Sequence, residues 1–320
     1  MSELNEERAR LLVRVASLYY EQGLTQKEVA QRIGLSRSNV SRLLTEAHRQ
    51  GIVEIRINHP WATSSELAAT LIRRFGLQDA LVLASGSPDR NEVLRGMGVL
   101  AARYLERILK PNSILGIGWG TALYEVVHEL RHTRIPGIEV VQIIGGTGSL
   151  NPQIDGTELA RQLARALGAR YRYLHAPLIV ETAELCRALM QDRNIHESLE
   201  VGRKADVALV GIGAVVREIS SLTRSGHLRE NELSWLQAIG AVGDICAQHF
   251  DIHGRICAPE LNSRVVGLRL DELQRIPCVI GVAGWREKAP AILGALRGKY
   301  VDVLVTDDAA AQEVLRLAGE

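Results

Sequence analysis

The stretch LTQKEVAQRIGLSRSNVSRLLT, Leu24–Thr45, decides the fold of the first part of this chain. Thr25 followed by Glu28 forms a capping box, in which the hydroxyl accepts from a free N–H of a new helix and the glutamate bonds back to the cap. Apolar residues at helical spacing follow, and Gly34 is the residue type that ends a helix. Ser36 can then cap a second helix. The stretch therefore predicts two short helices joined by a tight turn.

Two helices joined in this way form a helix-turn-helix, whose second helix enters the major groove of DNA. A two-helix corner in an ordinary helical core would show a similar periodicity, but here Ala30, Gly34 and Val40 sit where helix contact is closest, with polar residues of the DNA-binding type outside. Those residues are abundant here, so DNA binding is the favoured interpretation. The sequence predicts DNA contacts by Thr25, Gln26, Ser36, Arg37, Ser38, Asn39, Ser41 and Arg42.

Length and composition indicate a globular protein of two domains. The 320 residues are 46% hydrophobic, which is enough to bury a large core. The net charge of +1 argues against a protein that coats nucleic acid indiscriminately. Basic charge is instead local, because residues 36–50 hold Arg37, Arg42 and Arg49 against Glu46 alone.

The remaining composition points to a cytoplasmic protein without a cofactor. The four cysteines (Cys186, Cys246, Cys257 and Cys278) are far apart and have no histidine at zinc-ligand spacing, so free structural thiols are expected. The N-terminus is acidic and helical, unlike a signal peptide. No apolar run approaches the ~18 residues of a membrane span.

The domain boundary is expected near residue 59, which gives a DNA-binding domain at 1–59 and a second domain at 60–320. Glu6–Gln22 has apolar residues at helical spacing and should pack across the two motif helices. Ile52–Ile57 alternates in part like a strand, which suggests a wing, although no hairpin partner is evident.

The second domain alternates β-type runs with helical patterns, after a capped helix at Ser64–Phe75. Continuous Val/Ile runs between helices predict a doubly wound α/β fold, with a parallel sheet covered on both faces. The expected strands are Ala80–Ala84, Ile114–Ile117, Ile138–Ile144, Tyr171–Leu174, Val207–Gly211, Val279–Ala283 and Val301–Thr306. The expected helices between them include Glu92–Leu109, Ala122–Leu130 and Glu158–Leu167.

Glycines gather where the strands of this sheet should end, which is where ligands bind in open α/β sheets. The segments are Gly116–Thr121, Gly145–Gly148, Gly211–Ala214, Gly240–Asp244 and Gly284–Lys288. The first of them also opens a helix, whose free N–H groups can hold an anion. Its glycine spacing does not match the GxGxxG fingerprint of dinucleotide sites, so a ligand pocket is predicted but NAD is not.

The ordered set of helix-turn-helix, GIGWGTAL, IIGGTG, ADVALVGIGA, GAVGDI and GVAGWREKAP resembles the SorC family of bacterial sugar-responsive transcription regulators over nearly the whole chain. The resemblance implies a second domain related to ribose-5-phosphate isomerase and glucosamine-6-phosphate deaminase, which binds a sugar or sugar phosphate effector. It also implies a homo-oligomer, usually a tetramer, on operator DNA.

The resemblance and the glycine-rich strand ends together predict the effector-binding residues. These are Gly118, Trp119, Gly120, Thr121, Gly145, Gly146, Asp155, Gly211, Asp244, Gly284 and Lys288. Gly118, Gly120 and Thr121 match the phosphate-side loop of the family, and Lys288 matches its phosphate-contacting lysine. Asp155 and Asp244 lie near positions that contact sugar hydroxyls in some members. Ile144 departs from members that carry an arginine there, which removes one phosphate clamp.

Each of these assignments has a plainer alternative. Lys288 could be a solvated surface lysine, and Asp155 and Asp244 could be helix caps. Trp119 and Trp285 could stack on a sugar or pack in a core. His249 and His253 are ordinary hydrogen-bonded or surface histidines in the simplest interpretation.

An enzyme is the alternative function: a sugar-phosphate isomerase or deaminase with a DNA-binding appendage. Such chemistry needs a placed general acid and base, and the Asp and His residues of the second domain are scattered in the sequence. A regulator, and not an enzyme, is therefore predicted.

Overall fold

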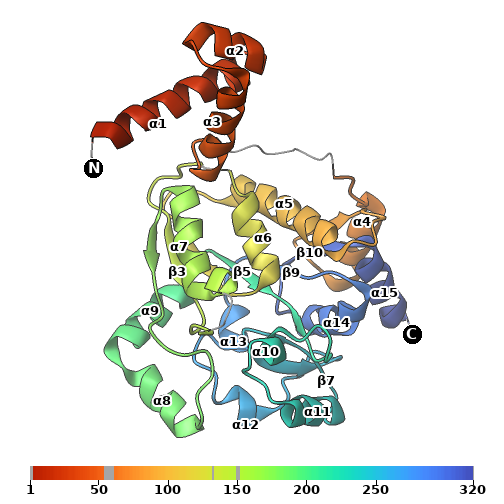
Figure 1. Cartoon of the computed structure of the whole chain (residues 1–320). Coiled ribbons are helices and arrows are strands. Elements are labelled where there is room, and N and C mark those ends of the chain that lie inside the picture. Colours follow the sequence, from red (N-terminus) through yellow and green to blue (C-terminus); the bar gives the residue numbers. More distant parts are fainter. Residues whose placement is uncertain (1–2, 54–60, 132, 149–151, 320) are drawn as a thin grey trace. The chain divides into compact units, whose positions relative to one another are not determined.

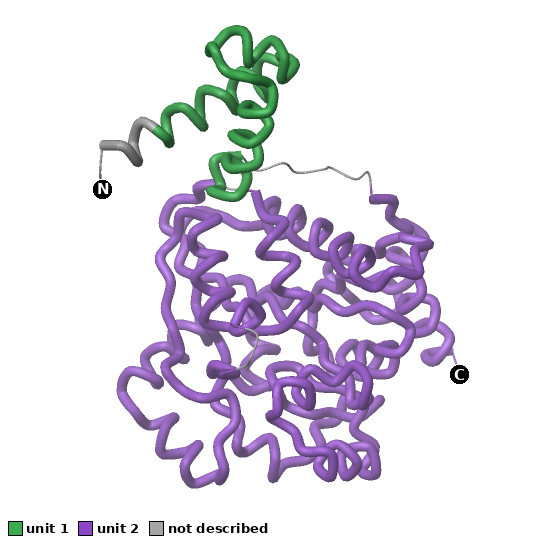
Figure 2. The backbone as a smooth tube through the Cα atoms, in the orientation of Figure 1, with its two compact units in different colours: residues 1–60 green, residues 61–320 purple. Residues whose placement is uncertain are grey.

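The computed structural model describes residues 3–53, 61–131, 133–148 and 152–319. It divides the chain into two compact units, residues 1–60 and 61–320, which Figure 2 colours separately. The domain boundary expected at residues 59 and 60 lies outside the described residues. Each unit is described by itself below.

The N-terminal unit is helical and contains the predicted helix-turn-helix. Its elements are α1 (Glu3–Ala16), the π-helical turn η1 (Ser17–Glu21), α2 (Gln26–Ile33) and α3 (Arg37–Arg49). The capping box is present: the Glu28 N–H donates to Thr25 Oγ1 at 3.4 Å, and the Thr25 N–H donates to Glu28 Oε2 at 2.8 Å. Gly34 ends α2 with φ 73°, a conformation that glycine adopts without strain. Ser36 caps α3 by accepting from the Asn39 N–H at 3.2 Å.

A small apolar core holds these helices together. Leu12 and Val15 of α1 pack with Val29 of α2 and Val40 of α3, and all four are fully buried. The helix expected over Glu6–Gln22 is interrupted, because the Gln22 N–H bonds to the Ser17 carbonyl five residues back. Most of the wing strand expected at Ile52–Ile57 lies outside the described residues, and Ile52 and Val53 pack against the core without forming a strand.

The C-terminal unit is built on a seven-stranded, entirely parallel sheet, as predicted. Its strand order is β1-β10-β9-β5-β2-β3-β4. The bounds are β1 Asp79–Leu83, β2 Ile114–Ile117, β3 Glu139–Gln142, β4 Arg170–Arg172, β5 Val207–Gly211, β9 Val279–Val282 and β10 Val303–Asp307. The chain runs outward from β2 to β4 and then returns to the other side of β2, so the order reverses between β2 and β5.

Helices cover both faces of the sheet. On one face, α5 (Arg90–Ile108), α6 (Thr121–Glu129) and α7 (Gly156–Leu167) lie side by side and share a core with β2 and β10 (Figure 1). The other face is covered by α4, α9 and α15, with a second core. The remaining helices are α4 Ser65–Phe75, α8 Ala183–Gln191, α9 Arg193–Arg203, α10 Ser221–Arg224, α11 Glu230–Ala238, α12 Pro259–Asn262, α13 Leu270–Leu273, α14 Ala289–Arg297 and α15 Asp308–Gly319, with 3₁₀ turns η2 Pro152–Ile154 and η3 Arg286–Lys288.

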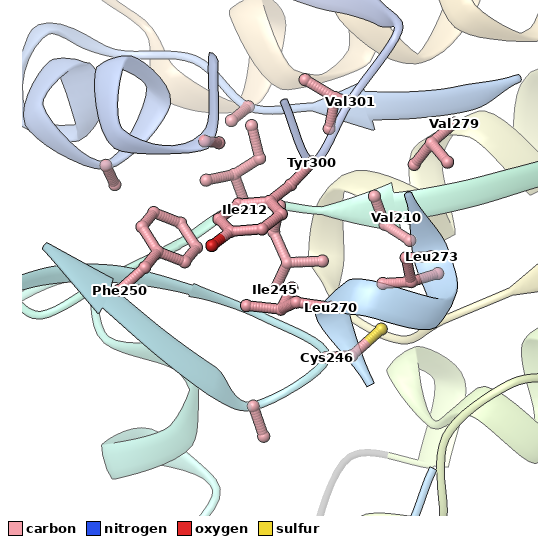
Figure 3. Packing of buried hydrophobic residues seen from close by; sticks show 14 of the residues in the cluster. Val210, Ile212, Ile245, Cys246, Phe250, Leu270, Leu273, Val279, Tyr300 and Val301 are labelled. Carbon is pink, nitrogen blue, oxygen red and sulfur yellow. The ribbon is translucent and has the colours of Figure 1, made fainter. Parts of the chain in front are cut away.

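A second, antiparallel sheet corrects one sequence prediction. The strands β6 (Gly213–Ala214), β7 (Ala241–Ile245) and β8 (Gln248–Asp251) form it in that order. The segment Gly240–Asp244 is therefore not the carboxyl end of a parallel strand, because Gly240 precedes β7 and Asp244 lies within it. Buried and partly exposed residues alternate along β7, and α14 and α11 both pack against this strand. Figure 3 shows the packing beneath this sheet, where Ile245 and Phe250 meet Ile212 and Tyr300.

Candidate functional site

A cavity opens at the reversal of strand order between β2 and β5. The residues after β2 and β5 form its floor, and the Gly118 N–H donates to the Leu209 carbonyl at 3.0 Å across the two strands. Binding sites of doubly wound sheets lie at such a switch point, outside the carboxyl ends of the strands. The small sheet, α10 and η3 supply the other walls: Ser221, Leu222, Asp244, Cys246 and Lys288.

The first turn of α6 forms one wall with its free backbone donors. Gly120 precedes the helix with φ 122°, and no side chain caps the first N–H groups. The Gly120 N–H itself is used, since it donates to the Ile154 carbonyl at 3.0 Å. The wall therefore offers uncapped N–H groups and the Thr121 hydroxyl at the positive end of the helix dipole, an arrangement that favours an anion.

Lys288 brings an ammonium group to this cavity from η3. Its Nζ donates to the Ile212 carbonyl at 2.9 Å, which leaves two of its three N–H donors without a partner among the described residues. Burial lowers the pKa of Lys288 to about 8, and the nearby Asp244 offsets part of this effect. Lys288 is half-buried and lines the cavity, so it is not a fully solvated surface lysine.

Asp244 places a carboxyl group in the same cavity. Burial raises its pKa, although His249 and Lys288 nearby both favour the ionised form. Its Oδ2 accepts from the Ala247 N–H at 3.2 Å. Its Oδ1 lies against Gly213, where a Cβ would be 2.0 Å away. Asp244 caps no helix, so the capping alternative is wrong for this residue.

The cavity brings together most, but not all, of the predicted effector residues. Those on its wall are Gly118, Trp119, Gly120, Thr121, Gly211, Asp244 and Lys288. The wall also contains residues that the sequence analysis missed, including Ser221, Leu222 and Cys246. Ser221 and Leu222 belong to a four-residue helix, and nothing in their sequence marks them as binding residues.

Four predicted residues do not lie on the cavity wall: Gly145, Gly146, Asp155 and Gly284. Gly145 permits close backbone packing, since a Cβ there would be 2.3 Å from the Pro177 carbonyl oxygen, and a Cβ at Gly284 would meet Met97. Asp155 caps α7 through the Thr157 N–H at 2.9 Å. Burial opposes its ionisation, but hydrogen bonds from Thr147 and Thr157 outweigh this and lower its pKa.

The two tryptophans of the glycine-rich turns differ in position. Trp119 lines the cavity and is also part of the core, with 9% of its surface exposed. Trp285 is not on the cavity wall. Its ring lies beside two cations, at 5.5 Å from Lys288 Nζ and 5.4 Å from Arg90 Cζ, both within the range of cation–π attraction.

In the N-terminal unit, the predicted DNA-contacting side chains of α3 are all exposed: Arg37, Ser38, Asn39, Ser41 and Arg42. Thr25 and Ser36 are exposed and serve as caps, and Gln26 is half-buried. A groove lined by Tyr19, Tyr20, Gly23–Lys27 and Arg37 places the start of α2 on the same face as the start of α3. Lys27 was not among the predicted contacts, and it adds a cation to this face.

Other classes of site are not evident in the described part of the chain. All four cysteines are free thiols. Over the same residues, no group of three or more His, Cys, Asp or Glu side chains could hold a metal ion. Among the described residues, no helix is both long enough and apolar enough to cross a membrane.

Comparison with known proteins assigns the family. A family model described as "Putative sugar-binding domain" matches residues 59–316, and one described as "Sigma-70, region 4" matches residues 1–50. The deoxyribonucleoside regulator of Bacillus subtilis (strain 168) is 33% identical over 98% of this chain and 99% of its own length. The crystal structure of the full-length sorbitol operon regulator SorC from Klebsiella pneumoniae covers 97% of this chain and 99% of its own, with TM-score 0.73 and 32% identity. The chain belongs to the SorC family.

Membership of the SorC family settles the choice between regulator and enzyme. The transcriptional regulator LsrR of Klebsiella pneumoniae subsp. pneumoniae is also similar, with 35% identity over 96% of this chain and 93% of its own. The chain is therefore a DNA-binding transcription regulator with a sugar-binding domain, as predicted. The isomerase or deaminase alternative has no support among these relatives.

Proposed function

We propose that the cavity between β2 and β5 binds the sugar or sugar phosphate that controls operator binding. The uncapped first turn of α6 and the Lys288 ammonium would hold the anionic or most polar end of the effector. Asp244 would accept hydrogen bonds from its hydroxyls. The observation that carries this proposal is that three polar groups from three separate elements converge on one cavity at the switch point of the sheet.

Among the described residues that line the proposed effector site, Lys288 is the one cation. Ile144, which replaces the arginine of some family members, is fully buried in the core and does not line the cavity. The anionic end of an effector would therefore depend on Lys288 and the helix N-terminus. Predicted contacts outside the wall, such as Gly145 and Asp155, would act indirectly, by holding the loop after β3 in place.

For the N-terminal unit, we propose that the outer face of α3 reads operator bases and that the start of α2 contacts phosphates. Arg37 and Arg42 are exposed and form no ion pair among the described residues. Their guanidinium groups are therefore free to pair with guanine, a contact worth about 1–3 kcal/mol of base discrimination.

The regulator would act as a symmetric homo-oligomer, with a tetramer as the form proposed from the family resemblance. One recognition helix covers only part of an operator, and two-fold symmetry doubles the contact at half-sites separated by whole turns of DNA. An effector that binds two assemblies unequally would shift the population between them, and so change operator affinity.

A thermal-shift screen of the full chain tests the effector assignment. The panel is ribose 5-phosphate, deoxyribose 5-phosphate, glucosamine 6-phosphate, sorbitol 6-phosphate and the four unphosphorylated parents. A compound that binds the native state raises the unfolding temperature. At least one panel member should do so in the wild type and lose its effect in Lys288→Ala. Equal shifts in both proteins would contradict the cavity assignment.

An operator shift assay tests the N-terminal unit. Arg37→Ala and Arg42→Ala should each weaken operator binding, and each should relax specificity at one base position. Lys110→Ala is a matched control, because Lys110 is an exposed cation of the other unit. Unchanged affinity in both arginine variants would show that α3 is not the recognition helix.

A further inference from the structure

His249 is a buried titratable residue that the proposed effector contacts do not use. It lies on β8 with no exposed surface, directly opposite Asp244 of β7 in the sheet register. Directly opposed residues of an antiparallel pair have neighbouring side chains on the same face. The imidazole is therefore next to a carboxyl group that lines the cavity, although it is not itself on the cavity wall.

Asn262 of α12 fixes which imidazole nitrogen carries the proton. Its amide Nδ2 donates to the Cys257 carbonyl at 2.8 Å and to the His249 carbonyl at 3.4 Å, and its Oδ1 accepts from the His249 N–H at 2.9 Å. These bonds determine the amide orientation, so the atom 3.3 Å from His249 Nδ1 is the acceptor Oδ1. Nδ1 must therefore be the protonated nitrogen, and Nε2 carries a lone pair.

The Nε2 lone pair has no protein partner in the described part of the chain, and the atom is buried. Burial lowers the pKa of His249, which keeps the ring neutral and Nε2 an acceptor. The adjacent Asp244 carboxyl group is also an acceptor when it is ionised, and one of its oxygens already accepts from the Ala247 N–H. An unsatisfied buried acceptor is destabilising, so Nε2 needs a donor that Asp244 can share. An O–H group can meet that need, and a water molecule can donate to both.

We propose that His249 is a positioning residue of the effector site, which holds an O–H donor between its Nε2 and the Asp244 carboxyl group and so fixes how Asp244 faces the cavity. The donor is a water molecule in the free protein, and a hydroxyl of the effector can replace it. The inference rests on the proposed function only where it concerns the effector. The arrangement of Asn262, His249 and Asp244 belongs to the free protein.

The first test is the tautomer of His249 in the free full-length chain. Nuclear magnetic resonance of the 15N-histidine-labelled protein should show a His249 ring that is protonated at Nδ1 and unprotonated at Nε2 at pH 7. The resonance is assigned by its disappearance in His249→Gln. Exposed His253 serves as the control and should show exchange between tautomers. A His249 ring protonated at Nε2 would overturn the proposal, and this measurement needs no destabilising variant.

The second test is a double-mutant cycle between His249 and Asp244, read by urea unfolding of the free protein. His249→Phe removes the acceptor and keeps the ring, and Asp244→Asn changes its neighbour. If the two share one donor, their effects on the unfolding equilibrium constant should be coupled by about tenfold or more. His253→Phe paired with Asp244→Asn should show no coupling. Additive effects of His249→Phe and Asp244→Asn would refute the shared donor.

The third test connects the arrangement to ligand binding, with the sugars and sugar phosphates of the thermal-shift panel as probes. His249→Phe should weaken a bound panel member about tenfold, while His249→Gln, whose amide oxygen can replace the Nε2 acceptor, should retain most of the affinity. Equal losses in both variants would reduce His249 to a packing role. If no panel member binds the wild type but the cycle shows coupling, the effector assignment fails and the hydrogen-bond arrangement stands.

Discussion

Replacing Lys288 by methionine should make the free protein more stable at neutral pH, although the same lysine is proposed to hold the effector. Burial lowers its pKa from 10.5 to about 8. Each pKa unit corresponds to about 1.4 kcal/mol, so the protonated amine costs the folded state about 3 kcal/mol at pH 7. Methionine removes this cost, which already includes the attraction to Asp244, but it also removes the hydrogen bond to the Ile212 carbonyl. A net gain of about 1–2 kcal/mol is therefore expected.

The pH dependence of this gain has a definite sign. Between pH 8 and 10.5, the unfolded chain keeps the Lys288 proton while the folded protein releases it. Stability of the wild type relative to the variant therefore rises with pH across this window. The advantage of Lys288→Met should be greatest below pH 8 and should shrink at higher pH.

Urea unfolding at fixed protomer concentration, at pH 7 and at pH 9.5, measures both quantities. Lys110→Met is the matched control and should change stability by less than about 0.5 kcal/mol at either pH, since Lys110 is exposed. A variant that is less stable than the wild type at pH 7, or a difference that does not change with pH, would refute the account of Lys288 as a desolvated cation.

Three further outcomes are expected. Gly213→Ala should weaken binding of the best panel compound at least about tenfold, because the Cβ of the new alanine would force Asp244 to move. Operator affinity should survive. Unchanged compound affinity, measured by calorimetry, would contradict the role of Asp244. Thr25→Ala should lower the free energy of unfolding of the N-terminal unit by about 1 kcal/mol, because it removes the capping box. Urea unfolding measures the loss, with Thr45→Ala as the control. Equal losses in the two variants would rule out a contribution from the cap. Light scattering at micromolar concentration should give a multiple of the 35.1 kDa chain mass, and a monomeric mass with and without DNA would exclude the proposed oligomer.

The sequence predicted those parts of the fold that depend on local signals. The capping box at Thr25 and the glycine stop at Gly34 are read from adjacent residues, so the helix-turn-helix was predicted almost to the residue. Apolar runs similarly identified the parallel strands inside the sheet, because a strand buried on both faces needs them. The edge strand β4 was also predicted, although its residues are largely exposed.

The antiparallel sheet was not predicted, because its strands are short and half-covered. β6 has two residues, and β7 contains Gly243 and Asp244, which resemble a turn in sequence. The same difficulty affects the site. Gly145 and Gly284 were expected to approach a ligand, but they accommodate Pro177 and Met97. A glycine can allow a positive φ, close packing or the approach of a ligand, and only tertiary structure shows which of these applies.

The pairing of β1 with β10 has a consequence for biosynthesis. The first strand of the C-terminal unit takes its place beside the last, and Asp79 is in register with Val303. During translation, the sheet therefore stays incomplete until nearly the entire chain has left the ribosome. The helices of the N-terminal unit, whose core lies within residues 11–53, can fold long before that. A newly made regulator should thus acquire its DNA-binding structure early and its sensing structure last, and a chain that stops before β10 would retain the first without the second.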